Sequence, residues 1–145
     1  AKTLATELVL GGLTLVGGGT ESHLMLIDFS IIGLSGNIAA EALEVAGIVT
    51  NKNTIPGDKS PFYPSGIRIG TPAVTTLGMK ENEMEIIAKI ILKVIDYIKD
   101  EKLPDEIKEK ASFLKKYKNK VKSDKFLLEI GKEVRKLMLK FPVPK

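Results

Sequence analysis

The sequence contains no cysteine, no tryptophan and only one histidine, His23. Without cysteine, disulfide bonds and thiolate metal sites are excluded, and a single histidine makes a poor metal site, so we expect no bound metal. No apolar run approaches the roughly 20 residues that a membrane-spanning helix needs. Amphipathic sequence follows Lys2 directly, so no signal peptide is recognisable. These absences favour a cytoplasmic protein without a membrane partner.

Arginine is also scarce, because lysine supplies all of the 22 basic residues except Arg68 and Arg135. The net charge of +4 comes mainly from the C-terminal part, where residues 115–125 form the densest basic stretch. This stretch could bind nucleic acid or form a solvated helical surface. Acidic residues are interspersed and no arginine and aromatic pattern suggests base stacking, so we favour the surface and expect no nucleic-acid partner. Abundant lysine, glutamate and isoleucine is also typical of thermophile proteins.

The chain divides into two unlike halves. Residues 1–80 are rich in glycine and short apolar runs, and residues 81–145 have the apolar periodicity of helices. The first half predicts a helix over 1–10, strands over 13–16 and 23–29 that form an antiparallel hairpin, a helix over 36–46 between Ser35 and Gly47, a strand over 48–50, a loop over 51–64 and a strand over 67–70. The second half predicts helices over 81–99 and 105–118, with Pro104 in the first turn of the latter, and a last helix capped by Ser123. The expected fold class is α+β, with a small, mostly antiparallel sheet and helices packed on one face.

Two short segments of the first half could carry chemistry. Glycines 17–19 with Thr20 could cradle a phosphate, but they lack P-loop spacing, and a hairpin turn is favoured. His23 could act in acid–base chemistry, but a supporting role behind the residues that touch a ligand is favoured. No Ser/His/Asp constellation is recognisable in the sequence.

Arg68 lies between two isoleucines and two glycines in the segment Ser65–Ala73. Its planar guanidinium fits a carboxylate through two parallel hydrogen bonds, and its alternation with isoleucine predicts that it points away from the core. A structural ion pair with an acidic side chain is the alternative, and the residues alone leave both open. In the preceding loop, Asn53 can bind the edge of a heterocycle and Phe62 offers a flat apolar surface, but the loop could equally be a stiffened connection.

Several segments together resemble serine hydroxymethyltransferase, in order and in approximate spacing. They are Gly18–Leu24 (GGTESHL), Leu34–Gly36 with Ala40–Leu43, Asn51–Pro56 (NKNTIP), Ser60-Pro61-Phe62, Ser65–Ala73 (SGIRIGTPA) and the tail from Val134 through Phe141–Val143. Each motif alone is weak, whereas the ordered set is specific and covers essentially the whole chain. The resemblance implies that residues 1–145 are the C-terminal small domain of a pyridoxal phosphate enzyme similar in fold to aspartate aminotransferase.

That family interconverts serine and glycine and passes a one-carbon unit to a tetrahydropterin carrier. The resemblance implies that Arg68 binds the substrate carboxylate and that the pterin contacts Asn53, Ser60, Pro61 and Phe62. It implies no catalytic residue within this fragment, because the family's Schiff-base lysine segment belongs to the large domain, which also binds most of the pyridoxal phosphate. We therefore expect the fragment alone to be inactive, and the full-length enzyme to be a homodimer.

Two departures from the family pattern concern the carrier. Many bacterial members have arginines where Thr76 and Leu77 stand here, and the loop between Asn53 and Arg68 is one residue shorter. The carrier is therefore either tetrahydrofolate or tetrahydromethanopterin. Rival interpretations are a stand-alone binding domain without catalysis and, less favoured, a lysine-rich nucleic-acid-binding domain.

Overall fold

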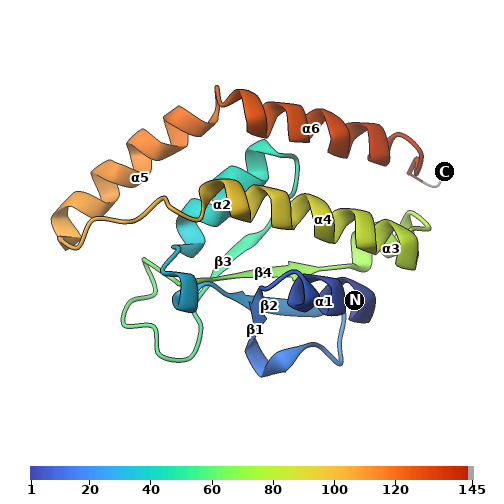
Figure 1. The fold of residues 1–145 in the computed structure, drawn as a ribbon, viewed down its shortest axis with the longest axis horizontal. Helices are drawn as coiled ribbons and strands as arrows, with labels where there is room; N and C mark the ends of the chain where they lie inside the picture. Colours follow the sequence, from blue (N-terminus) through green and yellow to red (C-terminus); the bar gives the residue numbers. More distant parts are fainter. Residues whose placement is uncertain (144–145) are drawn as a thin grey trace.

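The computed structural model describes residues 1–143 and shows a four-stranded sheet packed against helices (Figure 1). Residues 144 and 145, the end of the predicted helical half, lie outside the described residues. The strands are β1 (Thr14–Leu15), β2 (Leu24–Asp28), β3 (Asn51–Asn53) and β4 (Gly66–Gly70). The helices are α1 (Lys2–Leu10), α2 (Gly36–Val45), α3 (Pro72–Thr76), α4 (Glu81–Ile98), α5 (Ile107–Val121) and α6 (Lys125–Met138), with 3-10 turns η1 (Val16–Gly18) and η2 (Ser30–Ile32). The predicted α+β class is confirmed.

The sheet has the strand order β1-β2-β4-β3, and every neighbouring pair is antiparallel. The predicted hairpin is confirmed, since Leu15 of β1 lies opposite Ile27 of β2. The glycine-rich segment forms η1 and the rest of the connection between these two strands. It therefore has the place of a hairpin loop, and it does not lead from a strand into a helix as a phosphate loop does.

The core lies between one face of the sheet and the helices α1, α2, α4 and α6, of which α2, α4 and α6 lie above the sheet in Figure 1. The sheet contributes the alternate residues Met25, Ile27, Ile67 and Ile69, all of which are buried. Large helical side chains that are almost fully buried meet them there: Leu8, Ile38, Leu43, Ile91, Val94 and Leu127. Burial of each such side chain stabilises the fold by about 1.5–3 kcal/mol, so this contact between sheet and helices holds the domain together.

Helix α2 begins and ends as the sequence predicts. The Ser35 hydroxyl accepts the N–H of Asn37 at 3.1 Å and so caps the first turn. At the other end, Gly47 has a φ of 82°, which costs little without a Cβ. The N–H of Ile48 then bonds to the carbonyl of Leu43 at 2.8 Å, which closes the helix in a Schellman arrangement.

The predicted strand over 48–50 was wrong, and so was the assignment of 51–53 to the loop. Because Ile48 is used to close α2, the chain reaches the sheet only at Asn51, where β3 begins. This strand lies at the edge of the sheet and pairs only with β4. An edge strand with exposed side chains has no need of apolar residues, so its polar sequence gave no strand signal.

The C-terminal half is helical as predicted, with two differences at helix starts. Helix α5 begins at Ile107, and Pro104 precedes it instead of lying in its first turn. The cap of α6 is Asp124, whose carboxylate accepts the N–H of Leu127 at 3.0 Å, so the predicted cap Ser123 was wrong. The Ser123 hydroxyl instead donates to the carbonyl of Lys120 near the end of α5. No signal in the sequence separated two adjacent residues that are both good caps.

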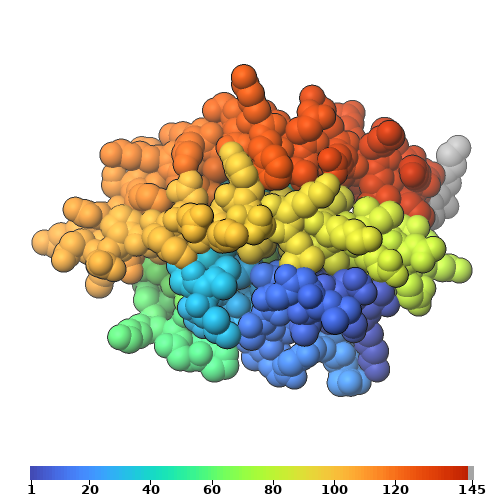
Figure 2. Space-filling model, viewed as in Figure 1, coloured from blue at the N-terminus to red at the C-terminus, as the bar shows by residue number. Residues whose placement is uncertain are grey.

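The space-filling view shows the helical half as one side of the molecule, with the segment around residue 60 (green) projecting at the opposite edge (Figure 2).

Within the basic stretch, Lys118 and Lys120 are ion-paired with Glu41 and Glu101. Across residues 1–143, every helix is too short or too polar to cross a membrane.

Candidate functional site

Arg68 lies on the face of the sheet opposite the helices. Its neighbours Ile67 and Ile69 are buried, whereas Arg68 itself is exposed, so the predicted orientation is confirmed. The other two β4 positions of the same alternation are Gly66 and Gly70. Arg68 is therefore the only side chain that β4 presents on this outer face, with no β4 side chain beside it.

A cross-strand row places Arg68 between a leucine and an asparagine. Leu26 of β2 and Asn51 of β3 both lie directly opposite Arg68 in the register. The Arg68 Nη2 donates to the Asn51 side-chain oxygen at 3.3 Å. Among the described residues Arg68 makes no ion pair, so the structure does not show the predicted alternative of a structural salt bridge. Within residues 1–143 the guanidinium donates one hydrogen bond, to a neutral amide, so most of its donors are left for a ligand.

Asn53 shares this outer face, two residues along β3 from Asn51 and opposite Gly66. That spacing separates the two backbone positions by about 7 Å. The Asn53 amide is half-buried and donates to the carbonyl of Thr54 at 2.9 Å. The sheet thus brings Asn53 and Arg68 to one surface.

The loop after β3 is organised around Asp58. Its carboxylate accepts the backbone N–H groups of Ile55 and Ser65, each at 2.9 Å. Burial alone would raise the pKa of the Asp58 carboxyl, but the hydrogen bonds from Ser65 and Ile55 outweigh it and hold that pKa below its ordinary value. Sequence reasoning missed Asp58, although an aspartate after Pro56-Gly57 is a recognisable turn signal.

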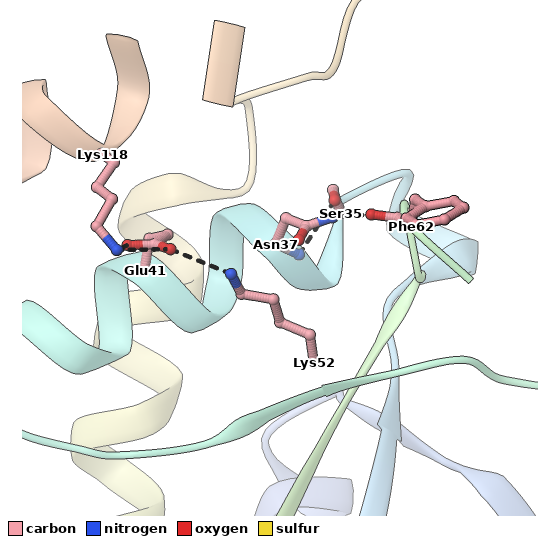
Figure 3. Close-up of polar contacts among 6 residues, drawn as sticks. All are labelled: Ser35, Asn37, Glu41, Lys52, Phe62 and Lys118. Atoms are coloured by element: carbon pink, nitrogen blue, oxygen red, sulfur yellow. Dashed lines mark hydrogen bonds and ion pairs between the residues drawn. The ribbon is translucent and has the colours of Figure 1, made fainter. Parts of the chain in front are cut away.

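The start of α2 holds the same loop from the other side (Figure 3). Asn37 is buried, and its side-chain amide donates to the carbonyl of Phe62 at 3.2 Å. The N–H of Gly36 donates to the carbonyl of Pro64 at 2.8 Å. Sequence reasoning also missed Asn37, because no pattern distinguishes a buried amide in a first helical turn from an exposed one. These contacts make the loop an ordered part of the site.

A groove of about 930 Å³ runs between this loop and the start of α5. Of the predicted pterin residues, Ser60 and Phe62 line it, and the exposed Pro61 lies between them in the chain. The Phe62 side chain is 79% exposed, so its ring is available for stacking. On the α5 side, the Lys110 ammonium lies 5.2 Å from the centre of the Tyr63 ring.

His23 lies away from this groove. Its carbonyl accepts the N–H of Thr71 at 2.9 Å. This contact lies beyond Gly70, at the end of β4 that is distant from Gly66. The imidazole is exposed, and the part of the chain that the structure describes gives it no hydrogen-bond partner. The sheet therefore brings Arg68 and Asn53 to one surface, but neither of them lines the groove, and His23 lies at the far end of the sheet. Residues 1–143 also contain no cluster of histidine and carboxylate side chains that could hold a metal ion.

A family model described as serine hydroxymethyltransferase matches residues 1–91, which include the sheet, α2 and the whole loop. The chain belongs to the serine hydroxymethyltransferase family. The curated serine hydroxymethyltransferase of a Nitratiruptor species is 54% identical over 110 residues, which is 75% of this chain and 26% of that protein. The chain thus spans about a quarter of the length of this serine hydroxymethyltransferase.

Serine hydroxymethyltransferases use pyridoxal phosphate, which enzymes hold through a Schiff-base lysine. A Schiff-base lysine is activated by burial or by a neighbouring cation, which lowers its pKa. No lysine among residues 1–143 is buried. The described residues instead offer the exposed Arg68 and a polar loop, which suit the binding of ligands.

Proposed function

We propose that this chain is the C-terminal small domain of an enzyme that interconverts serine and glycine and transfers the one-carbon unit to a tetrahydropterin. The observation that carries the proposal is the exposure of Arg68 together with its lack of an ion-pair partner among the described residues. Its side chain is exposed on the face of the sheet opposite the helices and has a neutral amide as its hydrogen-bond partner. A planar, permanently charged fork with free donors is suited to the carboxylate of an amino acid.

In this proposal the large domain upstream supplies the Schiff-base lysine and most of the pyridoxal phosphate site. The small domain fixes the carboxylate through Arg68 and so orients the substrate relative to the cofactor. The fragment alone is inactive, and two full-length subunits form a homodimer. His23, which directly precedes β2, supports the site without touching the ligands.

The pterin contacts Asn53 and the Ser60-Pro61-Phe62 segment. The support for this is that the loop is fixed by Asp58 and Asn37 while the Phe62 ring is left exposed. A rigid loop with an exposed aromatic ring can stack on a heterocycle at low cost in conformational entropy. The carrier is tetrahydrofolate or tetrahydromethanopterin, and activity of the full-length enzyme with each of the two distinguishes them.

Arg68→Lys in the full-length enzyme tests the proposal. Lysine keeps the charge and loses the two-pronged geometry, so serine should bind about 100-fold more weakly. Arg135→Lys is the matched control, because this exposed arginine lies on α6. Titration of both variants with serine measures the dissociation constants. An unchanged serine affinity in Arg68→Lys would remove Arg68 from the site.

A further inference from the structure

Asn51 is placed to set the direction of the Arg68 guanidinium. It lies directly across the strand pair from Arg68 and accepts a hydrogen bond from Nη2 at 3.3 Å. An exposed arginine otherwise samples many rotamers, and fixing it on a ligand costs side-chain entropy. A partner that already holds one nitrogen reduces that cost before the ligand arrives.

The chemistry of this partner matters as much as its position. A carboxylate opposite Arg68 would neutralise the guanidinium and compete with a carboxylate ligand. The asparagine oxygen accepts one hydrogen bond and carries no charge, so the remaining donors stay available at full charge. Leu26 flanks the arginine on its other side and offers the aliphatic stem an apolar surface.

Asn51 is itself held in place from the other face of the strand. The next residue, Lys52, pairs with the Glu41 carboxylate of α2 at 3.1 Å, and Lys118 of α5 pairs with the same carboxylate at 3.1 Å (Figure 3). The side chain of Glu41 is only 12% exposed. This three-residue cluster, the Glu41 clasp, fixes the short edge strand that carries Asn51.

We propose that Asn51 is a positioning residue, which orients Arg68 for a carboxylate ligand without using its charge. The inference rests on the proposed function, because it takes Arg68 as the group that binds the substrate carboxylate. Asn51 acts only through Arg68, so its loss weakens binding of the amino acid and leaves binding of the pterin unchanged.

The test compares Asn51→Ala and Asn51→Asp in the full-length enzyme, with Asn82→Ala as a control on the exposed surface of α4. The alanine variant should bind serine and glycine about 10-fold more weakly, because the arginine loses its orientation. The aspartate variant has the same shape but adds a competing charge, so its loss should be larger, about 100-fold. The KM for the pterin should stay the same in all three variants.

A purely structural role predicts the opposite order, since aspartate would hold Arg68 at least as well as asparagine. Wild-type serine affinity in either Asn51 variant would overturn the proposal. Because the aspartate variant preserves the side-chain shape, it remains informative if the alanine variant loosens β3. Arg68→Lys in the same series separates the two claims. If only Arg68→Lys weakens serine binding, the positioning role fails; if Arg68→Lys does not, the proposed function of Arg68 fails.

Discussion

The two faces of β3 and β4 treat positive charge differently. On the helix side, Lys52 forms an ion pair with the carboxylate of Glu41, so the two charges compensate each other. On the outer side, Arg68 meets only the neutral amide of Asn51. The comparison teaches that a cation paired with a carboxylate serves the fold, whereas a cation beside an amide remains available for an anion from outside the domain.

The largest effect on stability is expected from the buried face. Ile67 of β4 is completely buried, whereas Leu26, on the opposite face of β2, is half-buried. Ile67→Ala should lower the free energy of unfolding by about 2–5 kcal/mol, because it removes core contacts and leaves a cavity. Leu26→Ala should cost less than about 1.5 kcal/mol. Urea unfolding of the chain measures both values, and equal losses would contradict the assignment of the faces.

The two glycines on the outer face of β4, Gly66 and Gly70, differ in how closely other atoms approach them. A Cβ on Gly66 would lie 2.5 Å from Cγ2 of Ile55 and 2.8 Å from the carbonyl oxygen of Ile27, whereas a Cβ on Gly70 meets nothing nearer than 3.2 Å. Gly66→Ala should therefore destabilise the chain by about 1–3 kcal/mol and displace the loop. Gly70→Ala should have a smaller effect. Amide hydrogen exchange of residues 54–65 would reveal the displacement, and unchanged exchange in Gly66→Ala would count against it.

The Glu41 clasp predicts a pH dependence. Burial would raise the pKa of the Glu41 carboxyl, but its bonds to Lys118 and Lys52 outweigh burial and hold that pKa below its ordinary value of 4.5. As the pH falls, the Glu41 carboxyl therefore takes up a proton in the unfolded chain before it does so in the folded chain. The stabilisation that the ionised carboxylate gives is complete above a pH of about 5 and is lost as the pH falls through the pKa of the folded state.

Glu41→Gln should remove this contribution, about 1 kcal/mol at neutral pH, and flatten the acid limb of the stability curve. Urea unfolding between about pH 3 and 7 measures the difference. Stability curves of the wild type and the variant that coincide over this pH range would show that the clasp contributes nothing.

The smallest effect is expected at an exposed ion pair of the helical half. Lys132 pairs with Glu129 one turn away on α6, and both side chains are largely exposed. Lys132→Ala should change the free energy of unfolding by less than about 0.5 kcal/mol, because solvent screens such pairs. A loss above about 1 kcal/mol would mean that surface charge stabilises this half more than its geometry indicates.

Local signals in the sequence predicted much of this fold. The two ends of α2 were predicted correctly at Ser35 and Gly47, because capping depends on only a few neighbouring residues. The alternation around Arg68 correctly predicted its exposure, because a strand with one buried face repeats every two residues.

The partners of these residues could not be predicted, because they depend on contacts between distant segments. Asn51 meets Arg68 only through the pairing of β3 with β4, and β3 has no apolar pattern. Asn37 reaches Phe62 across 25 residues of sequence, and nothing in its neighbours indicates that its amide is buried. The family resemblance supplied roles for Arg68 and the loop, but it gave no information about what holds them in place.

The central claim is that Arg68 binds the substrate carboxylate. The most direct test compares the binding of serine with that of ethanolamine, which is the same amine without the carboxylate. In the full-length enzyme, Arg68→Lys should weaken serine binding about 100-fold and leave ethanolamine binding unchanged, because only serine uses the guanidinium. Titration of the wild type and the variant with both amines gives this ratio. An equal loss for both amines, or no loss for serine, would contradict the assignment of Arg68 to the substrate carboxylate.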